Sequence, residues 1–190
     1  MKKLIALILA SVLCFALAVP VSASTAKPVE GLEAYMSLTD QGLISFDAAG
    51  AIRNGFPADF VARCEARAKA MNDLVLNGVT TITPDFTARV YLGTTRSNDT
   101  TYVEYQMWGY TVYYSVADTQ KIVDALPSNN TIIGIADVFR QVSTTAGLVA
   151  AGCTILTSTV RQAASKGTGI YVQIFDDGTT ATPHCTVGAR

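Results

Sequence analysis

Few residues of this 190-residue chain carry the chemistry of nucleophilic or metal-assisted catalysis. His184 is the only histidine and Cys185 follows it directly, which raises two readings, a thiol nucleophile activated by imidazole and a metal site. A metal site normally needs three or four ligands, and the sequence has neither a second histidine nor a Cys-x-x-Cys pair. A Cys/His nucleophile would need Cys64 or Cys153 to meet His184 in space. We therefore favour a histidine on an edge strand, beside a disulfide or a buried cysteine.

Two adjacent carboxylates, Asp176 and Asp177, have the composition of an acid–base pair, but Gly178 follows them and such a run is typical of a turn between strands. The sequence has no Gly-x-Ser-x-Gly, no His-Glu-x-x-His and no P-loop motif. The Gly-Thr-Gly run at 167–169 lacks the rest of a dinucleotide fingerprint. We predict no catalytic or metal-ligating residue, no cofactor and no enzymatic activity.

The cysteines leave a disulfide open. Four are present, of which Cys14 lies in the apolar N-terminal run described below. In an exported protein, Cys64, Cys153 and Cys185 either form one disulfide and leave one thiol, or all remain reduced and buried. If a disulfide forms, we expect it between Cys153 and Cys185, because they flank what reads as one helix-to-hairpin unit. Cys64 is the alternative partner.

Aromatic residues are concentrated in one segment, residues 102–114. Its members are Tyr102, Tyr105, Trp108, Tyr110, Tyr113 and Tyr114. Extended aromatic faces stack on sugars or lie at a membrane interface, so Trp108, Tyr110 and Tyr113 form a candidate binding surface. The alternative is that tyrosines fill both faces of a long strand for packing alone.

The segment from Gln141 to Val160 carries no charged residue, and its length is close to that of a membrane span. Small residues four apart, at 146/150 and 147/151, would permit close helix packing. However, seven of its 20 residues are serine or threonine, which favours a helix in the core of a soluble protein.

The N-terminus has the layout of a secretory signal peptide. Lys2 and Lys3 precede an apolar run at 4–19, and the sequence Pro-Val-Ser-Ala follows at 20–23. We expect cleavage between Ala23 and Ser24, so that residues 1–23 are removed and the mature protein is secreted. An uncleaved anchor is the alternative, but the apolar run is short for a membrane span.

Charge argues against two classes of partner. The signal segment contains two of the 14 basic residues and no acidic one, so the remaining chain has a formal charge of −3. A weakly acidic protein without a cluster of lysine and arginine is not expected to bind nucleic acid, or to be held electrostatically by anionic lipid.

The remaining sequence predicts one α+β domain, residues 40–190, after a flexible leader at 24–39. The predicted order is an N-terminal helical segment, a small antiparallel sheet or hairpin, an apolar helical pair and a C-terminal β-hairpin. We expect Asp47 to cap a short helix that ends at the Asn-Gly pair at 54–55.

Apolar residues at three- and four-residue steps predict an amphipathic helix from Pro57 to about residue 76. Its opposite face carries Arg63, Arg67 and Lys69. We expect this face to be solvated rather than a binding site.

Alternation predicts strands at 86–92 and 101–116, and in the second the apolar positions change phase. A β-bulge or tight bend at Trp108-Gly109 would absorb that change. Helical periodicity follows residue 118, and we expect helix again from about Ile132 to the glycines at 167–169, with caps from the residues at 129–131. Residues 170–187 read as a closing hairpin.

Three short runs resemble a loosely defined set of small exported proteins of Gram-positive bacteria, some of them bacteriocin-like. They are GLISFD at 42–47, WGYTVYYS at 108–115 and GTGIYVQI at 167–174, with apolar segments before the last. The resemblance spans most of residues 40–175. It implies export, a non-enzymatic protein and activity against neighbouring cells, and it supplies no catalytic residues.

Three functions follow as hypotheses. The leading one is an exported, non-enzymatic protein that acts outside the cell as a bacteriocin-like toxin or a membrane- or cell-surface-active protein. The alternative is a cell-envelope or carbohydrate-binding module that uses the aromatic strand. The third is a secreted Cys/His hydrolase.

Overall fold

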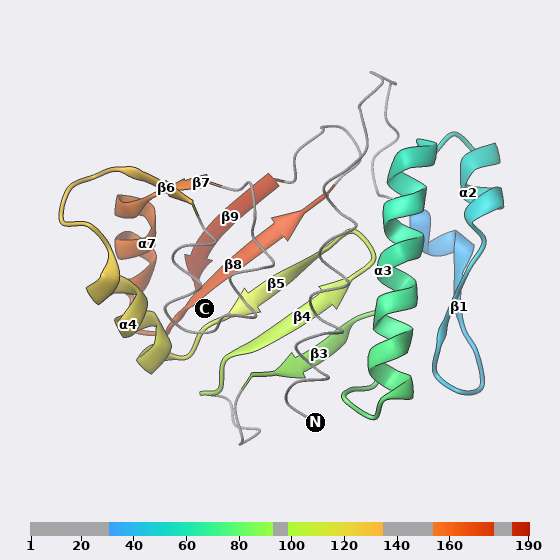
Figure 1. Cartoon of the computed structure of the whole chain (residues 1–190), viewed down its shortest axis with the longest axis horizontal. Helices are drawn as coiled ribbons and strands as arrows, with labels where there is room; N and C mark the ends of the chain where they lie inside the picture. The colour runs from blue at the N-terminus through green and yellow to red at the C-terminus, as the bar shows by residue number, and fades with distance from the viewer. Residues whose placement is uncertain (1–30, 93–98, 135–153, 177–183) are drawn as a thin grey trace. The chain divides into compact units, whose positions relative to one another are not determined.

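The structure is a computed structural model that describes residues 31–92, 99–134, 154–176 and 184–190 (Figure 1). The predicted signal peptide, residues 1–23, lies outside the described residues. Helices and antiparallel sheets occur together, which confirms the predicted α+β fold class. The chain divides into two compact units, and the region predicted as one domain, residues 40–190, contributes to both.

Among the described residues, the first unit holds 31–89, 105–109 and 176. Its helices and hairpin strands are η2 (Leu32–Tyr35), a 3-10 helix, then β1 (Met36–Leu38), β2 (Ile44–Phe46), α2 (Ala48–Arg53) and α3 (Ala58–Leu76). The flexible leader predicted for 24–39 is wrong over its second part, because η2 and β1 lie there. Met36 pairs with Phe46 in the β1–β2 hairpin and Leu32 is fully buried, so this stretch is part of the folded unit. Residues 24–30 lie outside the described residues.

The local signals for the two α-helices are confirmed. The Asp47 side chain accepts a hydrogen bond from the Gly50 N–H at 2.8 Å and so caps α2. After α2, Gly55 has a φ of 94°, a left-handed conformation that ends the helix at little steric cost for glycine. In α3 the predicted apolar stripe is buried at Phe60, Val61, Cys64, Ala68, Met71 and Leu74.

Helix α3 also holds the β1–β2 hairpin through one side chain. The Ile44 N–H donates to Asn72 Oδ1 at 2.7 Å, and Asn72 Nδ2 donates to the Ile44 carbonyl at 2.9 Å. The Asn72 amide therefore satisfies both backbone groups of one strand residue.

The second unit holds the described residues of 90–104, 110–175 and 184–190. Most residues of a five-stranded sheet belong to it, in the strand order β3-β4-β5-β8-β9. The strands of this sheet are β3 (Ala88–Tyr91), β4 (Tyr102–Gln106), β5 (Gly109–Tyr113), β8 (Ile170–Phe175) and β9 (His184–Ala189). Two helices and a two-stranded antiparallel sheet are also in this unit: α4 (Val116–Ala125), β6 (Ile132–Gly134), β7 (Thr154–Leu156) and α7 (Thr157–Ala164).

The phase change in the aromatic segment marks a hairpin turn. The segment predicted as one strand at 101–116 forms β4 and β5, joined by Met107 and Trp108. The predicted tight bend is therefore present, and the single long strand is wrong. Since the chain reverses at this turn, apolar residues on odd positions of β4 and even positions of β5 lie on one face of the sheet.

The helix predicted from Ile132 to the glycines at 167–169 is confirmed over α7, residues 157–164, and is wrong at residues 132–134 and 154–156, which are strands. Residues 132–134 form β6, which pairs antiparallel with β7, with Ile132 opposite Leu156. These stretches are rich in β-branched residues, and pairing with a distant segment selects the strand conformation over the locally ambiguous apolar pattern. Of the predicted membrane-length segment 141–160, residues 141–153 lie outside the described residues.

Helix α7 begins with contacts from the loop that was expected to cap another helix. Asn130 Oδ1 accepts from the Ser158 N–H at 3.3 Å, and Thr157 Oγ1 donates to the Asn129 carbonyl at 3.0 Å. The predicted caps at 129–131 therefore bind the start of α7. Helices α4 and α7 lie side by side, and α7 also lies along β9 (Figure 1).

The C-terminal hairpin is confirmed. Strands β8 and β9 pair antiparallel, from Ile170 opposite Ala189 to Phe175 opposite His184. Of the hairpin predicted at 170–187, residues 177–183 lie outside the described residues, and the returning strand β9 continues to Ala189.

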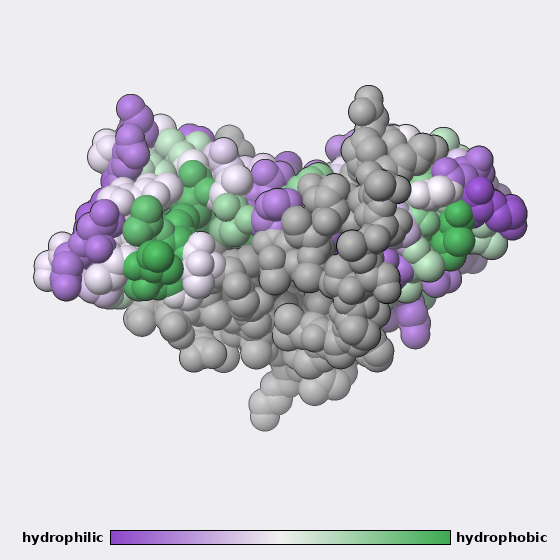
Figure 2. Space-filling model, turned by 90° about the horizontal axis from the view of Figure 1, so that it is seen from above, coloured by the Kyte–Doolittle hydropathy of each residue, from purple (hydrophilic) through white to green (hydrophobic). Residues whose placement is uncertain are grey.

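Some apolar side chains remain exposed in the second unit. Ile132 and Leu156, which face each other across β6 and β7, are both exposed. Figure 2 shows hydrophobic surface, in green, on the side where Figure 1 places these strands. Within the described ranges, no helix combines the length and apolarity that a bilayer crossing requires.

Candidate functional site

Four tyrosines form a row across one face of the five-stranded sheet, one from each of β3, β4, β5 and β8. This tyrosine row consists of Tyr91, Tyr102, Tyr113 and Tyr171. The ring centroids of Tyr102 and Tyr113 are 4.7 Å apart with an interplanar angle of 22°, so these two rings stack. Tyr91 lies 5.6 Å from Tyr102 at 47°, and Tyr171 lies 6.2 Å from Tyr113 at 45°. All four rings are half-buried.

The β4–β5 turn explains the central pair. Tyr102 is four residues before the end of β4 at Gln106, and Tyr113 is four residues after the start of β5 at Gly109. A two-residue turn therefore places the two tyrosines directly opposite each other, where cross-strand side chains make their closest contacts.

Glycine extends this face onto β9. Gly188 pairs with Tyr171, and a Cβ at Gly188 would lie only 2.5 Å from Cε1 of the Tyr171 ring. The ring can lie against the backbone only because residue 188 has no side chain. Two residues after Gly188, the Arg190 guanidinium carbon lies 5.1 Å from the Tyr102 ring centroid, within the range of a cation–π interaction.

Polar side chains accompany the aromatic rings. Glu104 follows Tyr102 by two residues in β4, and Gln173 follows Tyr171 by two residues in β8, so alternation puts them on the same face. Thr186 Oγ1 lies 3.5 Å from Gln173 Oε1. The face therefore combines aromatic surface with carboxylate, amide, hydroxyl and guanidinium groups.

The three aromatic residues predicted as a binding surface lie in different places. Trp108 is in the turn between β4 and β5, and Tyr110 and Tyr113 are in β5. Because Tyr110 and Tyr113 are three residues apart in a regular strand, they face opposite sides of the sheet. Of the three, Tyr113 belongs to the tyrosine row. The predicted surface missed Tyr91, Tyr102 and Tyr171, because their alignment with Tyr113 depends on which strands pair and in what order.

The structure separates the two parts of the His-Cys motif. His184 and Cys185 are consecutive residues of β9, so their side chains leave opposite faces of the sheet. In the β8–β9 register, His184 is opposite Phe175 and Cys185 is opposite Ile174. These two neighbours therefore cannot act together as a nucleophile and its base.

The other described cysteine is chemically protected. Cys64 is fully buried in α3, and burial raises the pKa of its thiol to about 12. Such a thiol is almost entirely protonated at neutral pH and is a poor nucleophile. Cys153 lies outside the described residues, so the structure does not describe the predicted Cys153–Cys185 disulfide. No disulfide is present among the cysteines that the structure describes.

A shallow groove of about 450 Å³ lies in the second unit, between strands β6 and β7, Thr159 of α7 and Cys185 to Val187 of β9. Its walls offer apolar surface, threonine hydroxyls and one thiol. Among its described lining residues there is no carboxylate or histidine, so the groove offers no acid–base pair for catalysis.

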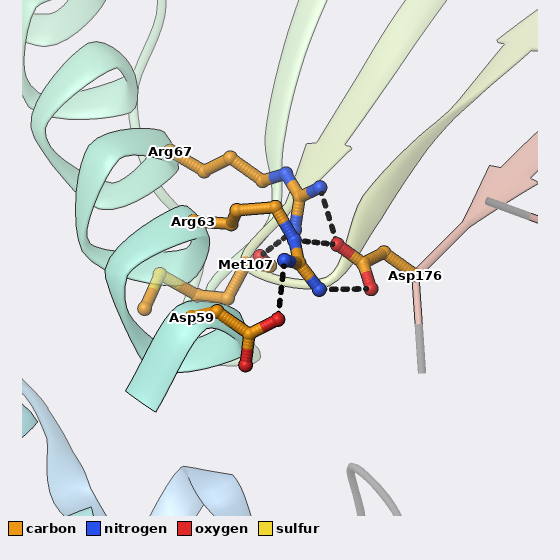
Figure 3. Close-up of polar contacts among 5 residues, drawn as sticks. All are labelled: Asp59, Arg63, Arg67, Met107 and Asp176. Atoms are coloured by element: carbon orange, nitrogen blue, oxygen red, sulfur yellow. Dashed lines mark hydrogen bonds and ion pairs between the residues drawn. The ribbon is translucent and has the colours of Figure 1, made fainter. Parts of the chain in front are cut away.

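A buried charge cluster in the first unit corrects the predicted solvated face of α3. Arg63 Nε donates to Asp176 Oδ2 at 2.7 Å, and one Nη of Arg67 donates to the same oxygen at 2.9 Å (Figure 3). A second Arg67 nitrogen donates to the Met107 carbonyl at 3.1 Å. The side chains of Arg63, Arg67 and Asp176 are 17%, 15% and 7% exposed, so neither arginine is solvated as predicted. Lys69 is exposed.

Asp176 is charged despite its burial. Burial by itself would raise the pKa of this carboxyl, but the hydrogen bonds and positive charges of Arg63 and Arg67 outweigh it and hold the pKa below its usual value. Asp59, one turn before Arg63 on α3, adds a bond of 3.1 Å to Arg63. Each charged group of the cluster therefore has an oppositely charged partner, and we assign the cluster a structural role. Asp177, its neighbour in the predicted turn, lies outside the described residues.

No group of three or more histidine, cysteine, aspartate or glutamate side chains in the described ranges is arranged to hold a metal ion. Comparison of the chain with protein-family models, with curated proteins and with solved structures finds no match.

Proposed function

We propose that this chain is an exported, non-enzymatic protein that binds carbohydrate of the cell envelope through the tyrosine row. The observation that carries the proposal is the alignment of Tyr91, Tyr102, Tyr113 and Tyr171 on one sheet face. Aromatic rings provide flat apolar surface against which the C–H faces of sugar rings pack.

The row is suited to an extended ligand. The outer rings are tilted by 47° and 45° against the stacked central pair, so the row is ridged rather than flat. Beside the rings, Glu104 provides hydrogen-bond acceptors, Arg190 provides donors, and Gln173 provides both. A few polar groups around an apolar surface fix the orientation of a ligand that is rich in hydroxyls.

The described chemistry supports binding over hydrolysis. His184 and Cys185 face opposite sides of the sheet, and Cys64 is buried with a raised pKa. A Cys/His hydrolase thus finds no nucleophile–base pair among these three described residues.

The toxin form of the hypothesis depended on the uncharged segment 141–160. In its described part, Thr154–Leu156 forms a strand, and Thr157 and Val160 of α7 are buried. These residues are engaged in the fold of the second unit. We therefore favour binding at the cell surface over insertion into its membrane.

Retention on insoluble peptidoglycan and on insoluble glucan tests the proposal. We expect Tyr102→Thr and Tyr113→Thr each to lower retention about 2- to 10-fold, the effect of losing one aromatic contact. Threonine keeps the strand preference at these positions, and circular dichroism would verify the fold of each variant.

Tyr110→Thr is the matched control, because Tyr110 is in the same strand as Tyr113 but on its other face. Trp108→Ala in the turn is a second control. Equal retention of all four variants, or no retention of the unaltered protein on either polymer, would contradict the proposal.

A further inference from the structure

The central pair of the tyrosine row has the geometry of an oxidative cross-linking site. Tyr102 and Tyr113 have the closest centroids of the row, 4.7 Å, and the most nearly parallel rings, at 22°. The neighbouring pairs are farther apart and tilted by more than 40°. Both central rings are half-buried, whereas Tyr105 and Tyr114 of the same hairpin region are buried.

We infer that Tyr102 and Tyr113 are coupled into a dityrosine when the protein meets hydrogen peroxide and a peroxidase. Directly opposed positions on paired strands hold the two rings together, so coupling within the chain proceeds at a high effective concentration. Coupling between two molecules lacks this advantage. The inference does not depend on carbohydrate binding.

The reaction balances with one peroxide. Each phenol gives up one electron and one proton, and peroxide accepts both pairs and becomes two waters. The two tyrosyl radicals then join through ring carbons next to their hydroxyls, forming one C–C bond. The hydrogens on those carbons move to the oxygens and restore two phenols, so the chain has lost two hydrogen atoms.

The product would tie β4 to β5 covalently, beside the turn that already joins them. Since the closed loop contains only the residues between 102 and 113, the bond constrains the unfolded chain modestly. Its effect would be to hold the hairpin closed when the rest of the sheet opens.

Digestion after glutamate gives a direct test, because Glu104 is the only glutamate between the two tyrosines. The chain is treated with hydrogen peroxide and a peroxidase and then cut after glutamate residues. We expect a mass lower by two hydrogen atoms and a peptide in which the segments before and after Glu104 remain joined. A dityrosine fluorescence signal should appear in parallel.

Tyr102→Phe and Tyr113→Phe should each abolish the joined peptide, since each removes a hydroxyl and keeps the ring in the fold. Tyr110→Phe, on the other face of β5, should leave its yield unchanged. Covalent dimers in place of the joined peptide, coupling at other tyrosines, or a joined peptide that persists in Tyr102→Phe would overturn the inference.

Discussion

Asp176 is the acceptor on which the buried charge cluster of the first unit depends. Replacing it with asparagine removes the carboxylate that Arg63 and Arg67 share, and leaves Arg63 with the partly exposed Asp59 alone in the cluster. We expect Asp176→Asn to lower the free energy of unfolding by about 2–4 kcal/mol, since breaking a buried ion pair strands the remaining charge. Urea unfolding followed by circular dichroism measures this change.

Asp59→Asn is the control for that experiment. Asp59 is 36% exposed and contacts Arg63 alone in the cluster, one helical turn away. Because water reaches the Asp59 carboxylate, its ion pair with Arg63 contributes little, and we expect a loss below about 0.5 kcal/mol. Similar losses for the two variants would show that the cluster does not centre on Asp176.

The same carboxyl sets a pH dependence. Because the pKa of Asp176 is lowered in the folded protein, the unfolded chain binds its proton more readily. Its contribution to stability is therefore present above the unfolded pKa of about 3.9 and is lost as pH falls through the folded value. We expect the stability of Asp176→Asn to fall less steeply below about pH 4 than that of the unaltered protein. Urea titrations of both proteins at several pH values measure this difference. If the free energy of unfolding depends on pH in the same way in both proteins, Asp176 is not the group responsible.

Cys64 should resist alkylation in the folded protein. Its thiol is buried and its pKa is raised to about 12, so both access and thiolate formation are restricted. We expect iodoacetamide to modify Cys64 at neutral pH only after denaturant is added, as located by peptide mass mapping. Rapid modification of the folded protein would mean that α3 opens readily.

At the residue scale, local signals were predictable and distant partners were not. The cap at Asp47 and the left-handed Gly55 follow from residue type at a helix end. The pairing of Arg63 with Asp176 joins positions 113 residues apart. Polar residues on the outer face of a helix look the same in sequence whether water or a buried carboxylate meets them.

The two glycines before β8 differ in what surrounds them. Gly167 has a φ of 73° and open space where a Cβ would lie, whereas Gly169 has a φ of 83° and a Cβ there would lie 2.4 Å from the Tyr114 carbonyl oxygen. We expect Gly167→Ala to cost about 1 kcal/mol, from the left-handed backbone alone. Gly169→Ala should cost about 2–4 kcal/mol, because backbone must also move. Thermal or urea unfolding of both variants would contradict this account if the two losses were equal.

At the element scale, helices and strands were predictable where apolar residues recur at a regular spacing within one segment. Helix α3 shows its buried stripe over about four turns, and β8 alternates through its whole length. Strands β6 and β7 have three residues each, and each strand forms its backbone pairing with the other, with Ile132 opposite Leu156. In so short an apolar run, periodicity does not separate helix from strand, and the partner decides.

At the scale of the whole molecule, the tyrosine row exists only because of strand order. Its members come from four strands, and β5 pairs with β8 although α4, β6, β7 and α7 lie between them in sequence. The sequence showed a cluster of aromatic residues in one segment, residues 102–114. Which of them would align with Tyr91 and Tyr171 depended on a turn of two residues and on sheet order, neither of which composition reveals.

Export is the remaining prediction that concerns the whole chain, and intact mass tests it. We expect the protein secreted by a Gram-positive host to begin at Ser24, because Ala23 ends the small-residue cleavage pattern. The described residues begin at 31, so cleavage after Ala23 would remove none of the described helices and strands.

Alkylation in denaturant, with and without reduction, extends that measurement to the thiols. A Cys153–Cys185 disulfide would leave Cys64 as the one group modified before reduction, and three modified thiols would exclude any disulfide. A secreted mass that retains residues 1–23, or retention of the full chain in the cell membrane, would contradict export by cleavage. Since a sheet face binds an envelope polymer only where the two can meet, that outcome would also remove the basis for carbohydrate binding outside the cell.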